Sequence, residues 1–322
     1  MRKTLLTTSG ILLLMFGSFS LVGAQASTKI DLTPENPEPR SSVSLTLTSF
    51  AFDVSSSLVT WKVNGAQILS GTGERTLVVK TGDVGESQVV TVTAQNQAGY
   101  FVEQKITITP ASVAIIYEAP RSHVPFFYEG RSFASTGGLV KVTALPSMSE
   151  DGGIIPSTSL SYTWYVNGEV LKKFSGFGKQ SAEFRLDYLQ DANEVRVVAR
   201  TPKGASVSKR ITISPFGVKP ILYRYNEIFG TQLNSPVGSR LQTTATVALT
   251  LEPYFISSKE DKPSTYKWLL DGFDVTPIQG QVLSLVPKEN SYGVRSLSVQ
   301  VTGPNRRLQS AETSVELIFD TR

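Results

Sequence analysis

Short runs in which every second residue is apolar recur along the chain, and three of them contain its only tryptophans, Trp61, Trp164 and Trp268. This alternation predicts a β-strand with one buried face. Each run ends in Asn-Gly or Asp-Gly, the dipeptides favoured in tight hairpin turns. The apolar sets of the three runs are Val59, Trp61 and Val63; Tyr162, Trp164 and Val166; and Tyr266, Trp268 and Leu270.

Similar alternating runs flank each tryptophan in a constant order. The upstream runs contain Val43, Leu45 and Leu47; Leu139, Val140 and Val142; and Val247, Leu249 and Leu251. The downstream runs contain Val90, Val92 and Ala94; Val195, Val197 and Ala199; and Leu297, Val299 and Val301. The tryptophans are 103 and 104 residues apart. Such a spacing predicts repeated domains, because solenoid repeats are much shorter.

Many short alternating strands separated by turn residues predict an all-β chain of antiparallel β-sandwiches. We expect three immunoglobulin-like sandwiches, covering residues 27–110, 111–215 and 216–322, with the boundaries near Pro110 and Pro215. Each tryptophan is expected to be a core residue of its own sandwich. The chain has no cysteine, so aliphatic residues such as Leu47 and Val92 are expected where antibody domains have a disulfide.

The tandem pattern Trp61-Lys62-Val63-Asn64-Gly65, repeated without cysteines, resembles the bacterial immunoglobulin-like and PKD-like β-sandwich repeats of exported surface proteins. The chain departs from the PKD pattern because it lacks an aspartate- and glycine-rich strand after the tryptophan. The resemblance implies a spacer, an adhesion module or a part of an envelope assembly. It brings no catalytic residues with it.

Residues 1–26 are predicted to be a secretory signal peptide. Arg2 and Lys3 precede an apolar run over 11–22, and Ala24-Gln25-Ala26 forms a cleavage motif. Cleavage would place the mature protein outside the cytoplasm, at the cell surface or in the periplasm. The alternative is an uncleaved anchor, in which case this segment alone contacts the membrane.

The charge balance argues against a nucleic-acid partner. The 31 Lys and Arg against 27 Asp and Glu give +4, which becomes +2 without Arg2 and Lys3, and no basic stripe is present. The lack of cysteine excludes disulfides, thiol catalysis and cysteine-ligated metals. His123, the only histidine, lies in a loop without a nucleophile motif. We therefore expect no catalytic residue, no cofactor and no bound metal.

The segment from 121 to 133 combines the histidine with aromatic and arginine side chains, a composition typical of interface centres. Three consecutive aromatics on an extended segment cannot all face one core. The candidate contact residues are Arg121, His123, Phe126, Phe127, Tyr128, Arg131 and Phe133. Because the segment closely follows the first domain boundary, it has an alternative interpretation as a lock between the first and second units.

These observations favour an exported, non-enzymatic structural or scaffold protein of the cell surface or envelope, with protein partners. The alternative is an adhesin or carbohydrate-binding surface protein that uses the aromatic segment for surface glycans. The least favoured interpretation is an accessory module of an envelope hydrolase.

Overall fold

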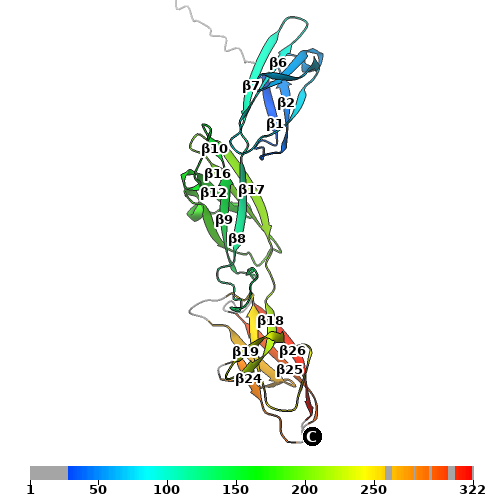
Figure 1. Cartoon of the computed structure of the whole chain (residues 1–322), viewed down its shortest axis with the longest axis vertical. Helices are drawn as coiled ribbons and strands as arrows, with labels where there is room; N and C mark the ends of the chain where they lie inside the picture. Colours follow the sequence, from blue (N-terminus) through cyan, green and yellow to red (C-terminus); the bar gives the residue numbers. More distant parts are fainter. Residues whose placement is uncertain (1–27, 258–262, 279, 290–291, 304–308, 321–322) are drawn as a thin grey trace, which may run out of the picture. The chain divides into compact units, whose positions relative to one another are not determined.

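The computed structural model describes residues 28–257, 263–278, 280–289, 292–303 and 309–320 (Figure 1). The predicted signal peptide lies outside these residues. The described chain is all-β and forms three tandem immunoglobulin-like sandwiches, which confirms the expected fold class. No helix in the described ranges has the length and apolar character needed to cross a bilayer.

The chain divides into two compact units. The first contains most of the first sandwich, Leu45–Leu77 and Val89–Ile106, together with residues up to Asp31. The second contains the remaining residues of that sandwich and all of the second and third sandwiches. The candidate site described below lies entirely in the second unit.

The first sandwich has two sheets, ordered β1-β2-β5 and β4-β3-β6-β7. Its strands are β1 (Thr28–Thr33), β2 (Ser42–Ser49), β3 (Leu58–Val63), β4 (Ala66–Thr72), β5 (Thr76–Lys80), β6 (Gln88–Gln95) and β7 (Phe101–Ile108). Trp61 lies opposite Val92 in the β3–β6 ladder. Both residues are buried, as is Leu47, in agreement with the expectation of an aliphatic core without a disulfide.

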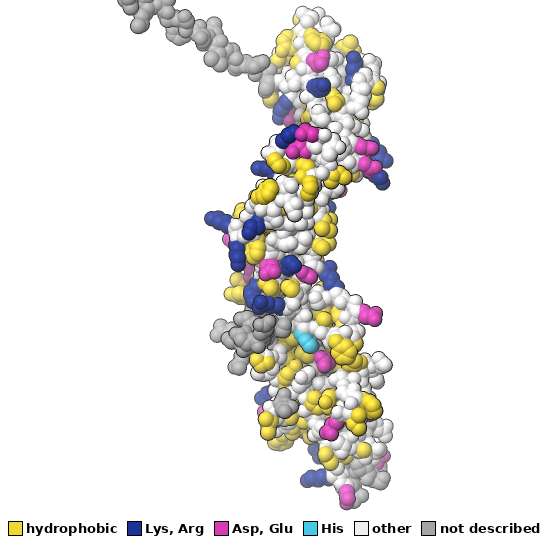
Figure 2. Space-filling view, turned by 60° about the vertical axis from the view of Figure 1, so that its left-hand side comes forward, with side chains coloured by type: hydrophobic (Ala, Val, Ile, Leu, Met, Phe, Trp, Pro, Cys, Tyr) yellow, Lys and Arg dark blue, Asp and Glu magenta, His cyan; other side chains and the backbone are white. Residues whose placement is uncertain are grey.

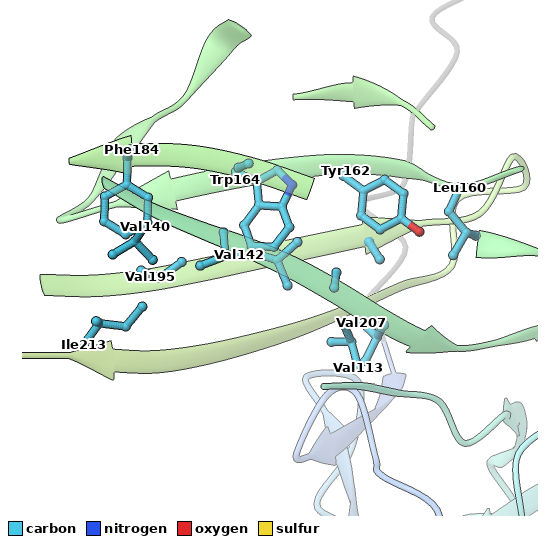
Figure 3. Close-up of a cluster of buried hydrophobic side chains, with 14 of the residues drawn as sticks. Val113, Val140, Val142, Leu160, Tyr162, Trp164, Phe184, Val195, Val207 and Ile213 are labelled. Carbon is cyan, nitrogen blue, oxygen red and sulfur yellow. The ribbon is translucent and has the colours of Figure 1, made fainter. Parts of the chain in front are cut away.

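The second sandwich has sheets ordered β15-β9-β8 and β13-β12-β16-β17, with β14 also paired to β12. Its strands are β8 (Ser112–Glu118), β9 (Leu139–Ser147), β12 (Ser161–Val166), β13 (Glu169–Val170), β14 (Gly176–Phe177), β15 (Ser181–Arg185), β16 (Asn193–Arg200) and β17 (Ser206–Ile213), beside a small hairpin of β10 (Ser149–Glu150) and β11 (Gly153–Ile154). Figure 3 shows Trp164 in the middle of its core, between Tyr162 and Val140.

The third sandwich has sheets ordered β19-β18-β21-β24 and β20-β26-β25-β22-β23. Its strands are β18 (Lys219–Asn226), β19 (Gly230–Pro236), β20 (Arg240–Thr243), β21 (Val247–Tyr254), β22 (Thr265–Leu270), β23 (Phe273–Asp274), β24 (Val282–Leu285), β25 (Tyr292–Thr302) and β26 (Ser310–Asp320). Two strands here, β19 and β20, have no counterpart in the second sandwich. They cover edges that remain open there.

All three tryptophans are fully buried and make the same hydrogen bond. The indole N–H donates to the backbone carbonyl of Glu74, Lys179 or Gly280, at 2.8, 2.9 and 2.7 Å respectively. A buried indole N–H needs such a partner, because an unsatisfied donor in a core is costly. The equivalent bonds show that the three sandwiches repeat in detail as well as in outline.

The Asn-Gly and Asp-Gly hairpins also repeat in detail. Both turn residues have positive φ, 48° and 86° at Asn64-Gly65, 51° and 84° at Asn167-Gly168, and 50° and 85° at Asp271-Gly272. These values fit the predicted type of tight turn. In each copy the Asn or Asp Oδ1 accepts a hydrogen bond from a backbone N–H next to or within the strand after the tryptophan: Val89, Glu194 or Ser296. The residue therefore forms the turn and also ties it to a second strand.

Asp271 gives the third copy of this turn a dependence on pH that the two Asn copies lack. Its carboxylate accepts from Ser296 N–H and pairs with Arg295 at 2.9 Å, and these contacts lower the pKa of Asp271 below its usual 3.8. A lowered pKa stabilises the fold at pH above about 3.8, and this stabilisation is lost as the pH falls through the folded-state pKa. We expect Asp271→Asn to remove this part of the acid sensitivity.

The measurement is thermal unfolding of the full chain from pH 5 to pH 2, in wild type and variant. Asn is the residue at the equivalent positions 64 and 167, so the variant keeps both the turn and the hydrogen-bond acceptor. The difference in melting temperature between the two proteins should change as the pH falls below 4. A difference that stays constant over the whole range would contradict the prediction.

A candidate partner-contact loop in the second sandwich

The candidate residues lie in the connection between β8 and β9, residues 119–138. β8 starts beside the first domain boundary and carries the chain along the sandwich, so this connection begins at the other end of the strand. Its aromatic residues pack against residues of the third sandwich. The alternative interpretation, a lock between the first and second units, is therefore wrong in its location, because the loop packs against the third sandwich.

Backbone hydrogen bonds hold the loop to the end of β21. His123 N–H donates to the Ile256 carbonyl, and Phe255 N–H donates to the His123 carbonyl, both at 2.7 Å. Ser122 forms an isolated antiparallel bridge with Ser257. These bonds satisfy backbone groups that water would otherwise need to solvate. The loop and the chain after β21 thus form a miniature two-stranded pairing.

Aromatic rings cover this pairing on one side. The ring centroid of Tyr128 lies 5.6 Å from that of Tyr254 and 5.8 Å from that of Phe255. Phe133 stacks on Phe216 at 4.9 Å and meets the edge of Phe255 at 5.4 Å. Such edge-to-face and offset pairs are favourable beyond the area that they bury. We call this group, with Phe127 and Tyr223, the joint cluster.

Two buried features strengthen the joint cluster. The hydroxyls of Tyr223 and Tyr254 share a hydrogen bond of 2.9 Å. Burial, followed by this bond, raises the pKa of Tyr254, so its hydroxyl stays protonated. Phe255 has a φ of 66°, a conformation that a bulky residue rarely adopts. Packing against four rings offsets the strain at this position.

The charged members of the candidate set are placed differently. His123 Nε2 lies 3.3 Å from Glu252 Oε2, with the imidazole partly exposed and the carboxylate mostly buried. Figure 2 shows the histidine side chain at the surface, in cyan, with hydrophobic side chains beside it. Arg131 lies 3.5 Å above the ring of Tyr117 and donates to the Tyr117 carbonyl. Arg121 is exposed.

Phe126 is the most exposed of the candidate aromatics. Its side chain is 93% exposed, whereas Phe127 and Tyr128, the next two residues, are partly buried. The ring of Phe126 meets the ring of Phe127 at 5.5 Å, edge to face. The loop therefore uses two consecutive aromatics in the joint cluster and turns the third to solvent. Whether Phe126 contacts a partner stays a prediction.

The sequence analysis missed the residues on the other side of the cluster. Phe216, Tyr254 and Phe255, which belong to the cluster, and Glu252, which faces His123, were not singled out. The available signal was the pair Tyr254-Phe255 directly after an alternating strand. Consecutive residues of an extended chain point to opposite sides, so only one of these two aromatic side chains can face the core of the sandwich. The other aromatic side chain needs a different segment to bury it.

The described residues contain no group of three or more side chains suited to a metal ion. Asp187 and Asn193, before and at the start of β16, make structural contacts with the backbone. Asn193 is buried, and its Oδ1 accepts from the backbone N–H of Asp187 and the side chain of Asn167. These residues shape the end of β16.

No protein-family model matches the chain, and no curated protein matches it. Similar solved structures include fibronectin(III)-like modules of CbhA from Clostridium thermocellum, 19% identical with a TM-score of 0.31, covering 59% of this chain and 94% of that one. Three domains of the outer capsid protein Hoc of bacteriophage RB49 are 11% identical, with a TM-score of 0.26, covering 92% and 99%. A bacterial ice-binding adhesin is 11% identical, with a TM-score of 0.21, covering 92% and 99%. At these values the likeness concerns the sandwich fold alone.

Proposed function

We propose that this chain is an exported, non-enzymatic structural protein of the cell surface or envelope, whose immunoglobulin-like sandwiches mediate protein contacts. The observation that carries the proposal is that the aromatic residues of the 119–138 loop are in part packed and in part exposed. Phe127, Tyr128 and Phe133 pack in the joint cluster, while Phe126 projects into solvent. A loop that fixes neighbouring sandwiches and presents one large apolar side chain suits a protein that positions other components.

The surroundings of His123 support a non-catalytic role. The imidazole faces the Glu252 carboxylate, and the backbone of the same residue is bonded to Ile256 and Phe255. A catalytic histidine needs an activated nucleophile within hydrogen-bond reach. The partner found here is a carboxylate that belongs to the joint, so the histidine acts as a structural contact in this proposal.

A glycan-binding adhesin is the second candidate, and one observation in the first sandwich favours it. Phe50, directly after β2, and Tyr100 and Phe101, at the start of β7, are exposed. The rings of Phe52 and Tyr100 lie 5.3 Å apart, tilted by 43°. Exposed rings of this kind are suited to the apolar faces of a neutral sugar.

The test is capture of envelope proteins by purified full-length mature protein carrying Phe126→Ala. We expect capture to fall several-fold, because truncation of an interface-centre aromatic commonly costs 2 kcal/mol or more of binding. Phe177→Ala is the matched control, since Phe177 is also exposed, at 69%, and lies in the same sandwich. The melting temperature should change little in either variant.

The same preparations are passed over immobilised neutral polysaccharide. Retention on polysaccharide that survives Phe126→Ala, without capture of any protein, would support the adhesin instead. Equal capture of a protein by wild type and Phe126→Ala would remove Phe126 from the contact surface. Hydrolysis of an envelope polymer that is lost on His123→Ala would overturn the non-enzymatic proposal.

A further inference from the structure

A groove lies on the surface of the second sandwich, between the ends of β8 and β17. It has a volume of about 490 Å³ and is lined by Ile115, Ile116, Tyr117, Arg131, Ile211 and Thr212. Most of this lining is apolar, and Ile116 is 54% exposed. The two strands are neighbours (Figure 1), although each is the last strand of its own sheet.

Both walls of the groove are open strand edges. β8 pairs with β9 on one side, and β17 pairs with β16 on one side. Among the described residues no strand pairs with either of the other sides. Natural proteins usually protect such an edge with a charge, a proline or a bulge. The stretch from Ala114 to Tyr117 contains no charge and no proline of its own, and its pairing with β9 is regular. Arg131 donates to the Tyr117 carbonyl, so the charge beside this edge lies at its Tyr117 end.

In the third sandwich, strands of the chain itself occupy the position that corresponds to this groove. Its first strand, β18, corresponds to β8, and its last strand, β26, corresponds to β17. There β19 pairs antiparallel with the free side of β18, and β20 pairs in parallel with β26. The corresponding groove is therefore filled by strands of the same chain.

The pairing of β8 with β9 and of β18 with β21 shows which residues of the two sandwiches correspond. Tyr117 lies opposite the core residue Val142, and Arg224 lies opposite the equivalent Leu249. β19 pairs with β18 at Tyr223, next to Arg224. The groove wall at 115–117 thus matches the part of β18 that β19 covers.

The other wall matches in the same way. Ile211 lies opposite Val195 in β16, and Val315 lies opposite the equivalent Leu297 in β25. Thr212 therefore corresponds to Glu316, where the pairing with β20 begins at Arg240. Both walls of the groove match the positions that β19 and β20 occupy in the third sandwich.

The second sandwich has a connection of equal length available but uses it elsewhere. Residues 119–138 and 227–246 both join the first strand to the next core strand, and each comprises 20 residues. The 119–138 connection forms no strand, and its backbone bonds at His123 to the chain after β21. Its aromatic residues pack in the joint cluster. The chain's own connection therefore contributes Arg131 to the groove but no strand.

From this comparison we infer that the groove receives an extended strand of a partner protein, which pairs with the free edge of β8. Backbone hydrogen bonds supply the affinity, and alternate apolar side chains rest on Ile116 and Ile211. Arg131 stands at the groove and selects a strand with an acidic residue nearby, because a guanidinium pairs strongly with a carboxylate. The inference does not depend on Phe126, so the two proposals can fail separately.

The experiment uses full-length mature protein and two capped synthetic peptides. One has the sequence of residues 228–238, which include β19, and the other carries Glu in place of Gln232. We expect both to bind, the acidic peptide about tenfold more tightly at low salt. Hydrogen exchange on peptide addition should slow in β8 and leave β18 unchanged, because β18 is already covered.

Two variants test the position of binding. Ile116→Lys places a charge on the exposed apolar wall and should weaken binding at least tenfold without loss of thermal stability. Ile154→Lys is the matched control, since Ile154 is also an exposed isoleucine of the second sandwich, at 76%. Arg131→Gln should abolish the preference for the acidic peptide.

Three results would overturn the inference. The first is no binding of either peptide at millimolar concentration. The second is binding that Ile116→Lys leaves unchanged. The third is binding without added protection in β8, which would indicate attachment to another surface such as Phe126.

Discussion

Replacing Trp164 by Ala is expected to lower the free energy of unfolding of the second sandwich by about 3–5 kcal/mol. The side chain is fully buried at the centre of the core, and its removal leaves a large cavity. It also removes the indole N–H that bonds to the Lys179 carbonyl, so that this carbonyl loses a partner. Trp61→Ala and Trp268→Ala should act in the same way on their own sandwiches.

The measurement is hydrogen exchange of the full chain in increasing denaturant, resolved by sandwich. In Trp164→Ala, protection should be lost first in β12 and β16, while β3 and β22 keep their wild-type midpoints. Trp164→Phe serves as a graded control, because it retains most of the apolar volume but not the hydrogen bond. Simultaneous loss of protection in all three sandwiches would contradict the independence of their cores.

Replacing Phe255 by Ala is expected to have the second large effect, about 3–5 kcal/mol. Its ring is buried against Phe133, Phe216 and Tyr128. The loss should appear as faster exchange of the amides of His123 and Phe255, which join the loop to the chain after β21. The control is Phe126→Ala, which removes a ring of the same size from a solvent-exposed position and should change stability little.

The backbone conformation at Phe255 allows a second comparison, between the Ala and Gly variants. Its φ of 66° strains any residue with a Cβ but suits glycine. Phe255→Gly should therefore be about 0.5–1 kcal/mol more stable than Phe255→Ala, the reverse of their usual order within an element. Equal stability, or a more stable Ala variant, would show that the positive φ does not contribute to the cost.

The fold could be predicted from the sequence because the patterns that specify it, alternating strands and turn dipeptides, are local and repeated. Trp61, Trp164 and Trp268 each lie in an alternating strand, and their burial follows from period and turn chemistry alone. The same argument gave the positive φ at Asn64 and Asn167. It did not give the hydrogen bonds from these side chains to Val89 and Glu194, because those depend on which strands become neighbours.

The candidate loop was readable only in part. Its composition singled out Phe126 and Tyr128, but composition does not indicate which surface the rings meet. The missing information was the direction of β8, which carries the loop away from the first boundary and toward the third sandwich. Phe216 and Phe255 lie between strands, about 90 and 130 residues later in the sequence, and no local pattern connects such positions.

The groove could not be seen in the sequence at all. Units two and three have similar leading strands and connections of equal length, so their patterns predict similar structures. Both connections contain proline, and Pro236 lies within β19 itself. The difference is that the 119–138 connection is held by the backbone bonds of His123 and by the rings of the joint cluster. It becomes visible only when the ladders of the two sandwiches are compared.

The parallel pairing of β20 with β26 has a mechanical consequence for the third sandwich. Arg240–Thr243 lies alongside Glu316–Phe319, and Arg240 also forms an ion pair with Glu316 at 2.7 Å. Tension that pulls these two strands in opposite directions loads all bonds of the ladder together, in shear. An antiparallel hairpin pulled from its open end breaks its bonds one at a time. Force that acts on β20 and β26 in opposite directions therefore meets a ladder loaded in shear, whereas β17 of the second sandwich has no such partner strand among the described residues.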